Sequence, residues 1–170
     1  MNDRAAEVEL YLLRHADAGD PLTWPGPDAE RPLSGKGKRQ AERLAGWLLA
    51  SGFAPDAIVS SPYRRAVQTA RRVAEGLGLE VIVDERLAAH LDLATVERLL
   101  TDLGSPHRPV LVGHDPDFSA LVASLCATRS APVSKGALVR IDAPRPLTPG
   151  GGTLRWLVPP DALTAARLHR

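Results

Sequence analysis

Three shortages in the sequence each exclude a class of protein. The chain of 170 residues has one cysteine, so it forms no disulfide bond within itself. No stretch approaches the roughly 18 consecutive apolar residues of a membrane-spanning helix. The formal net charge is only +1, which gives no electrostatic reason to expect nucleic acid or an anionic membrane as a partner. Residues 1–10 also lack the charged-then-apolar layout of a signal peptide, so we expect a cytoplasmic protein.

The remaining composition is that of an ordinary globular protein. Hydrophobic residues make up 44% of the chain and charged residues 24%, and the length suits one domain over residues 1–170. The single cysteine, Cys126, lies in an apolar pattern of helical spacing, which favours a small buried side chain over a nucleophile. The sequence has no internal repeat and no glycine-rich phosphate loop of the P-loop kind.

Segments of strand type alternate with segments of helix type along the chain. Strands are predicted at residues 7–13, 55–61, 79–85, 108–114, 135–143 and 152–160, and helices at 34–52, 61–78, 93–104 and 115–127. In the second helix, Ser61 suits the N-cap and Pro62 the first helical position. The proline-rich segment 19–34 predicts a long loop, and such loops are often functional. The alternation predicts a layered α/β fold with a mostly parallel sheet.

Polar side chains gather at the ends of three predicted strands. Arg14 and His15 end the first strand, Arg64 and Arg65 begin the helix after the second, and His114 ends the fourth. Ligands of such sheets bind outside the carboxyl ends of the strands, so we expect these side chains to converge there. Taken singly, a histidine in this position is more often structural, and such an arginine is more often solvated. An arginine in a first helical turn opposes the helix dipole, however, which favours a bound anion nearby.

Three short segments carry a recognisable pattern: LLRHADA at 12–18, SSPYRRAVQTA at 60–70 and VLVGHDPDFSALV at 110–122. Together they resemble the Arg-His-Gly, Ser-Pro-x-x-Arg-Ala-x-Gln-Thr and second-histidine segments of the histidine phosphatase superfamily, the phosphoglycerate mutase-like proteins. Ala16 stands where that pattern has glycine. The short length, RPLSGKG at 31–37 and LRWLVPP at 154–160 resemble the small SixA-type phosphohistidine phosphatases in particular. The resemblance implies a three-layer α/β/α sandwich.

The resemblance also implies roles for five residues. His15 would be the nucleophile that accepts the phosphoryl group, and Arg14 would bind the phosphoryl oxygens. Arg65 occupies the position of the signature arginine, His114 that of the second histidine, and Arg31 that of a substrate-binding arginine from the long loop. The chemistry agrees, because arginine forks match phosphoryl oxygens and a neutral histidine is well populated at pH 7. Such a site requires no metal, and we expect no cofactor.

The general acid of the larger superfamily members has no clear counterpart in this sequence. In those proteins a carboxylic acid, usually a glutamate after the third strand, protonates the leaving group. Here the region reads IVDERLAAHLDL, which makes Glu85 a possible acid, although Asp84 and Glu85 are equally well read as surface charges at a strand end. An imidazole leaving group needs less acid help than an alkoxide, so a site without a firm acid suits N-phosphorylated substrates.

The predicted function is hydrolysis of phosphohistidine in a protein, through a covalent phosphohistidine intermediate on the enzyme. A small phosphoester or nucleotide is the alternative substrate, and a non-catalytic phosphate-binding module is the alternative of a different class. A metal site made by His15, Asp17, His90 and His114 is conceivable, but their spacing matches no standard ligand pattern. The predicted partner is a phosphorylated protein or a small phosphorylated substrate, and the oligomeric state stays open.

Overall fold

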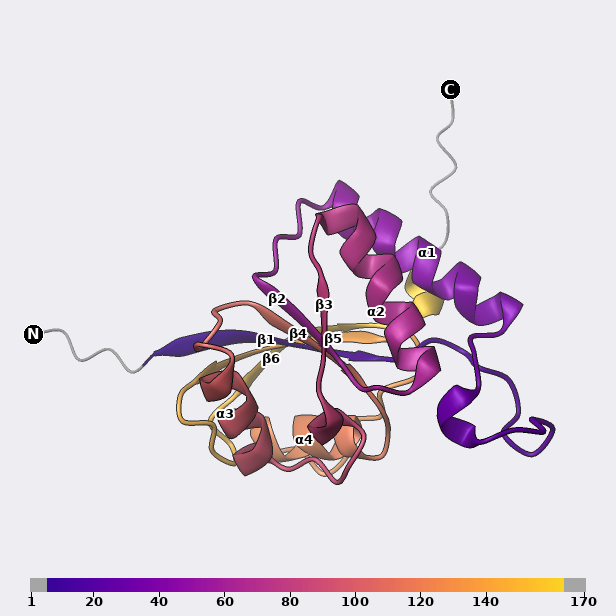
Figure 1. Cartoon of the computed structure of the whole chain (residues 1–170). Helices are drawn as coiled ribbons and strands as arrows, with labels where there is room; N and C mark the ends of the chain where they lie inside the picture. Colours follow the sequence, from indigo (N-terminus) through magenta and orange to yellow (C-terminus); the bar gives the residue numbers. More distant parts are fainter. Residues whose placement is uncertain (1–5, 164–170) are drawn as a thin grey trace, which may run out of the picture.

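The computed structural model describes residues 6–163, a sheet of six strands between two pairs of helices (Figure 1). The strands are β1 (Glu7–Arg14), β2 (Ala57–Ser60), β3 (Val81–Val83), β4 (Pro109–Gly113), β5 (Leu138–Pro144) and β6 (Thr153–Val158). The helices are α1 (Gly35–Ala50), α2 (Arg64–Leu77), α3 (Leu93–Asp102) and α4 (Asp117–Leu125). Short 3-10 turns lie at Asp28–Glu30, Glu85–Leu87 and Pro160–Ala162. Within residues 6–163, no helix has the length and apolarity to cross a membrane.

The sheet is mixed, and its parallel strands lie together. The strand order is β3-β2-β4-β1-β5-β6. The pairs β2–β3, β2–β4 and β1–β4 are parallel, whereas β1–β5 and β5–β6 are antiparallel. The predicted α/β fold with a mostly parallel sheet is therefore confirmed. Strand β4 lies inside the parallel part and is buried along its whole length, because helices cover both of its faces.

Helices cover both faces of the sheet because β1 buries side chains in both directions. Leu10 and Leu12 belong to a core cluster shared with α3 and α4, while Tyr11 and Leu13 belong to a second cluster shared with α1 and α2. Successive side chains of a strand point to opposite faces, so these two sets mark the two sides of one sheet. Figure 1 shows α1 and α2 on one side of the strands and α3 and α4 on the other. The three-layer α/β/α sandwich is confirmed.

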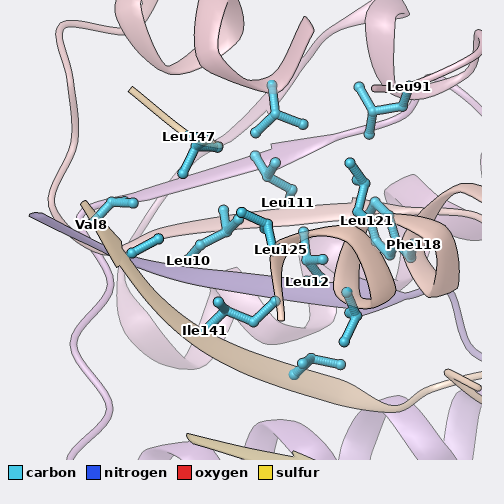
Figure 2. Close-up of a cluster of buried hydrophobic side chains, with 14 of the residues drawn as sticks. Val8, Leu10, Leu12, Leu91, Leu111, Phe118, Leu121, Leu125, Ile141 and Leu147 are labelled. Carbon is cyan, nitrogen blue, oxygen red and sulfur yellow. The ribbon is translucent and has the colours of Figure 1, made fainter. Parts of the chain in front are cut away.

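The larger core cluster fixes α4 against the sheet (Figure 2). Leu12 of β1 and Leu111 of β4 belong to it together with Phe118 and Leu125 of α4, and all four side chains are fully buried. Full burial of a leucine or phenylalanine contributes about 1.5–3 kcal/mol relative to exposure. These contacts hold the start of α4 in a fixed place beside the end of β4. Cys126 packs half-buried against the same cluster, and burial raises the pKa of its thiol.

The register of the parallel strands brings three strand ends to one level. Arg14, the last residue of β1, pairs with Gly113, the last residue of β4. His15 and His114 follow directly, so the two histidines leave neighbouring strands side by side. Strand β2 ends at Ser60, which pairs with Val112, the residue before the last one of β4. Residues at these ends therefore meet at a single edge of the sheet.

Helix α2 begins later than the sequence predicts. Its first residue is Arg64 and its N-cap is Tyr63, so the prediction of an N-cap at Ser61 is wrong. The hydroxyl of Ser61 is occupied elsewhere: it accepts a hydrogen bond from the backbone N–H of Tyr63 at 3.2 Å and lies 2.7 Å from Nε2 of His114. The serine thus serves the strand end and its neighbouring histidine, and the helix starts two residues further on.

The start of α1 is tied to the chain that follows His15. Ser34 caps the helix by accepting from the backbone N–H of Gly37 at 3.0 Å, and its hydroxyl donates to Oδ2 of Asp17 at 2.6 Å. Gly37 packs so closely that an added Cβ would overlap the carbonyl of Asp17. The helix therefore holds the residues just beyond His15 in one conformation.

Candidate active site

A pocket of about 570 Å³ opens at the carboxyl ends of the parallel strands. It is lined by all five residues to which the sequence gives a role: Arg14, His15, Arg31, Arg65 and His114. A shallow depression of about 650 Å³ over α2 and β3 is slightly larger, but its lining is an assortment of surface side chains such as Arg71 and Glu80. Chemistry rather than size therefore selects the pocket at the strand ends as the candidate site.

The ring of His15 is buried and its two nitrogens have different partners. The side chain is 5% exposed. Nδ1 lies 2.7 Å from the carbonyl oxygen of Ala16, which can only accept, so Nδ1 carries the proton. Nε2 is then an acceptor, and Nε of Arg65 donates to it at 3.3 Å. The hydrogen bonds thus leave a lone pair on Nε2, the nitrogen beside the arginine.

The surroundings of His15 keep its ring uncharged at neutral pH. Burial lowers the pKa of His15 from 6.5 to about 3, since the imidazolium form loses its hydration inside the protein. The bond to the Ala16 carbonyl opposes this shift, while the nearby His114 and the positive charges of Arg65 and Arg14 add to it. A neutral imidazole with a free lone pair is the form of histidine that attacks as a nucleophile.

His114 lies next to His15 and is also neutral. The ring centroids of the two histidines are 5.2 Å apart. Nε2 of His114 lies 2.7 Å from the Ser61 hydroxyl, and the ring of Tyr63 packs edge-on against His114 with centroids 4.9 Å apart. Burial lowers the pKa of His114 to about 4, and the positive charge of Arg65 adds to the effect. Two strand ends thus present two uncharged imidazoles to the pocket.

Arg14 has a buried donor without a partner. Its Nη1 donates to the carbonyl of Val133 at 2.9 Å and lies 3.6 Å from Oδ2 of Asp115. Within the described part of the chain, Nε of Arg14 is the one buried side-chain nitrogen or oxygen without a hydrogen-bond partner. A buried donor of this kind requires an explanation, and an oxygen of a bound anion supplies one.

Arg65 and Arg31 share one carboxylate, which the sequence did not single out. Nη2 of Arg65 donates to Oδ2 of Asp28 at 2.9 Å, and Nε of Arg31 donates to Oδ1 at 3.0 Å. Partial burial alone would raise the pKa of Asp28, but the hydrogen bonds from Arg31 and Arg65 hold it below its usual value. Asp28 lies in the loop 19–34, where no periodicity marks individual residues, so only its place in a long loop could have pointed to it.

The carboxylates that line the pocket are not the ones that the sequence suggested as a possible general acid. Glu85 has an exposed side chain and does not line the pocket, and the carboxylate of Asp84 is held by Arg86 in an ion pair of 2.8 Å. Two other carboxylates, those of Asp115 and Asp117, line the pocket instead. Both lie just after His114, inside the second-histidine segment at 110–122, where neither carboxylate had a predicted role of its own.

Asp115 and Asp117 differ in how far their oxygens are occupied. Both oxygens of Asp115 accept hydrogen bonds from Ser119, at 3.0 Å from its backbone and 2.6 Å from its hydroxyl. Oδ2 of Asp117 accepts from the backbone N–H of Leu91 at 3.3 Å, and Oδ1 lies 3.6 Å from Nδ1 of His90. Of the two carboxylates, that of Asp117 therefore has the longer and weaker contacts.

Arg64, which the sequence placed beside Arg65 at the start of α2, has an exposed side chain.

No cluster of metal ligands forms among residues 6–163: nowhere in that range do three His, Cys, Asp or Glu side chains lie in a position to hold an ion. Asp17, one of the residues considered for such a site, is bound instead to Ser34, and its other oxygen lies 3.6 Å from Nζ of Lys135. The donors that face the pocket are arginines and histidines, a set that suits an anion.

Comparisons with known proteins agree with this geometry. The model of the histidine phosphatase superfamily (branch 1) matches residues 10–100, more than half of the chain. The chain is 29% identical to the phosphohistidine phosphatase SixA of Escherichia coli (strain K12), across 94% of this chain and 99% of that protein. The solved structure of the protein histidine phosphatase SixA complexed with tungstate superposes with a TM-score of 0.78 at 26% identity, covering 92% of this chain and 100% of that one.

A further solved structure shares the fold. The mycobacterial glucosyl-3-phosphoglycerate phosphatase has a TM-score of 0.66 at 21% identity, covering 88% of this chain and 97% of that one. The fold therefore occurs in proteins whose names give different phosphorylated substrates, and it does not by itself select one. The family match covers the stretch that contains Arg14, His15 and Arg65, and the chain belongs to the histidine phosphatase superfamily.

Proposed function

We propose that this protein is a phosphohistidine phosphatase, which removes phosphate from a phosphohistidine-bearing protein through a covalent phosphohistidine intermediate on His15. The observation that carries the proposal is the state of His15: Nδ1 is bonded to the carbonyl of Ala16, and the lone pair of Nε2 faces Arg65 inside the pocket. Of the two nitrogens, only Nε2 carries a lone pair, and it can attack phosphorus once the hydrogen bond from Nε of Arg65 is given up to the phosphoryl group.

The first step transfers the phosphoryl group to the enzyme. The guanidinium groups of Arg14, Arg31 and Arg65, which line the pocket, bind the phosphoryl oxygens and balance their negative charge. Nε2 of His15 attacks phosphorus while the P–N bond of the substrate breaks. The departing imidazole of the substrate takes up a proton from solvent and leaves as a neutral ring.

The second step returns the enzyme to its starting state. Water attacks the phosphorus of the phosphohistidine, the P–N bond to Nε2 of His15 breaks, and inorganic phosphate leaves with the hydroxyl of that water. His114 is neutral and stands beside His15, so it can accept a hydrogen bond or a proton from the incoming water. The pocket opens to solvent, which gives that water access.

The wall beyond the cations favours an imidazole as the leaving group. Besides the arginines and Lys135, the lining contains Leu87, Ala88, Ala89 and His90, and the carboxylate of Asp117 lies 3.6 Å from Nδ1 of His90. Small apolar side chains and a carboxylate suit a flat ring that is neutral or positively charged. The same carboxylate repels a leaving group with its own negative charge, such as a glycerate or a nucleotide. The similarity to SixA, whose name gives phosphohistidine as substrate, supports the same choice.

A second candidate is a phosphatase that acts on a small phosphoester or a nucleotide. Asp117 favours it, because a carboxyl group that lines the pocket can supply the proton that an alkoxide leaving group needs. Such general acid help contributes about 10²–10⁴-fold in rate. A phosphate-binding module without turnover is the third possibility. For each of the three, the predicted partner is a phosphorylated protein or small molecule and the predicted location is the cytoplasm.

The test measures phosphate release from a histidine-phosphorylated protein and from para-nitrophenyl phosphate, without added metal. The wild type is compared with His15→Ala and with His107→Ala, a matched control because His107 is exposed at the opposite end of the sheet. Release that is lost only in His15→Ala, with the phosphohistidine protein preferred, supports the proposal. Preference for the ester selects the second candidate. A folded protein that binds phosphate but releases none from either substrate is a binding module.

A further inference from the structure

Asp28 connects two of the pocket arginines through a single carboxylate. Its Oδ1 accepts from Nε of Arg31 at 3.0 Å and its Oδ2 from Nη2 of Arg65 at 2.9 Å. The backbone carbonyl of Asp28 accepts from Nη1 of Arg65 at 2.8 Å as well. The guanidinium groups are nearly buried, with Arg31 7% and Arg65 6% exposed, whereas the side chain of Asp28 is half exposed. One loop residue thus supplies three of the acceptors around the two cations.

These contacts decide which edge of Arg65 meets His15. The guanidinium of Arg65 has five N–H donors in one plane. Two of them are directed at Asp28, which turns the Nε edge toward Nε2 of His15 at 3.3 Å. Without the carboxylate, Nη2 of Arg65 has no hydrogen-bond acceptor among the described residues, and only an anion in the pocket can supply one. The orientation of Arg65 before substrate arrives therefore depends on Asp28.

The carboxylate also lies between two like charges. Arg31 and Arg65 both carry a positive charge that burial does not remove, so their mutual repulsion favours separation unless an anion bridges them. Arg31 keeps two further bonds through Nη1, to the carbonyls of Ala18 at 2.7 Å and Gly19 at 3.1 Å. Among the described residues, the guanidinium of Arg65 donates hydrogen bonds only to Asp28 and His15, and it also lies 4.9 Å from the centroid of the Tyr63 ring. Without the carboxylate, Nη2 of Arg65 therefore loses its one hydrogen-bond acceptor among those residues, whereas Arg31 keeps two bonds to backbone carbonyls.

We propose that Asp28 is a positioning residue: it holds Arg31 and Arg65 in the geometry in which they receive the phosphoryl group and stabilise it during transfer. This inference rests on the proposed function of the pocket. It assigns to the 3-10 turn Asp28–Glu30 a task in the reaction, although the turn contributes no group that touches the reacting atoms.

An effect of Asp28 through its negative charge alone predicts a different result from an effect through positioning, so an experiment can separate the two. If Asp28 acted only through its charge, removing that charge would make the pocket more positive, tighten the binding of inorganic phosphate and lower KM. If Asp28 positions the arginines, removing the charge leaves them misaligned, so kcat falls and phosphate binds no more tightly. Misplacement of a binding group by about 1 Å can cost on the order of 10²-fold in rate.

The experiment compares Asp28→Asn and Asp28→Glu with Glu30→Gln. Glu30 is exposed in the same turn, and among the described residues its side chain has no hydrogen bond or ion pair, so the control removes one charge without touching the arginines. The quantity measured is the kcat of phosphate release from the histidine-phosphorylated protein. It should be about 10- to 100-fold lower in Asp28→Asn than in the wild type. It should recover partly in Asp28→Glu and equal the wild-type value in Glu30→Gln. The inhibition constant of inorganic phosphate should be unchanged or higher in Asp28→Asn.

Wild-type kcat in Asp28→Asn, or tighter inhibition by phosphate, overturns the inference. Should Asp28→Asn fail to fold, as thermal unfolding would show, Asp28→Ser carries the same expectation. His15→Ala is measured alongside. If His15→Ala retains activity, the proposed function fails; if it is inactive while Asp28→Asn and Asp28→Ser are fully active, only the positioning inference fails.

Discussion

The pH dependence of stability follows from the two histidines of the pocket, buried His15 and partly buried His114. The pKa of His15 is about 3 and that of His114 about 4 in the folded protein, whereas an unfolded chain gives each the usual 6.5. When the pH falls below 6.5, the unfolded state takes up two protons that the folded state refuses. A state that binds more protons gains free energy as pH falls, so the folded protein should lose stability between pH 6.5 and the lower pKa values.

The size of the effect can be worked out per histidine. Each unit of pH below 6.5 costs about 1.4 kcal/mol for every proton bound only by the unfolded state. Because an unfolded histidine is already half protonated at pH 6.5, the loss between pH 6.5 and pH 5 is about 1.7 kcal/mol for each histidine and about 3.3 kcal/mol for both. That window lies above the usual carboxyl pKa values of about 3.9 and 4.3, so Asp and Glu contribute little to it. A loss of this size is a large share of the stability of an ordinary domain.

Urea unfolding at several pH values between 6.5 and 5 measures this loss. In His15→Asn the slope of the unfolding free energy against pH should fall to about half, because one of the two protons is removed. In His107→Ala the slope should stay that of the wild type, since the exposed His107 side chain lies outside the pocket. A wild-type stability that does not change over this window would refute the reasoning, and so would a wild-type slope in His15→Asn.

Two further predictions test a candidate acid and a close backbone contact. Glu85→Gln should leave turnover of an alkyl phosphate such as glycerol 2-phosphate within about twofold of the wild type, while Asp117→Asn should lower it at least about tenfold, because the alkoxide leaving group needs a proton and, of these two carboxyl groups, only that of Asp117 lines the pocket; equal losses in the two variants would contradict this. Gly37→Ala should lower the urea-measured unfolding free energy by about 1–3 kcal/mol, because a Cβ there overlaps the carbonyl of Asp17. In Gly46→Ala, where nothing lies within 4 Å, the same change should add about 0.5–1 kcal/mol.

The layers of this fold were predictable because burial leaves a repeating pattern in the sequence. Leu10, Tyr11, Leu12 and Leu13 read as a continuous apolar run, and such a run is typical of a strand with helices on both faces. The strand order carries no comparable local signal, since it depends on which strands pair across the sheet. The N-cap of α2 was mispredicted for a related reason: the Ser61 hydroxyl is occupied by His114, a residue 53 positions away.

Arg31 of the long loop was predicted through the family resemblance, but Asp28 of the same loop was beyond sequence reasoning for a physical reason. A polar residue at the end of an apolar strand stands out, because the buried part of the strand excludes it, and Arg14 and His15 are noticed for that reason. Asp28 lies among polar and proline-rich neighbours that water would accept equally well, so nothing local separates it from Asp20 or Glu30. Only the arrangement of two buried guanidinium groups around it does so.

The position of His15 joins the stability of the fold to its chemistry. An imidazole at the end of a buried strand loses most of its hydration, which keeps it neutral and leaves its lone pair free, but also makes acid destabilise the fold. Moving the ring to the surface would remove that cost, and it would also raise the pKa of His15 and separate Nε2 from the arginines. In the proposed reaction, the same burial that weakens the protein at low pH is therefore what keeps His15 neutral for attack on phosphorus.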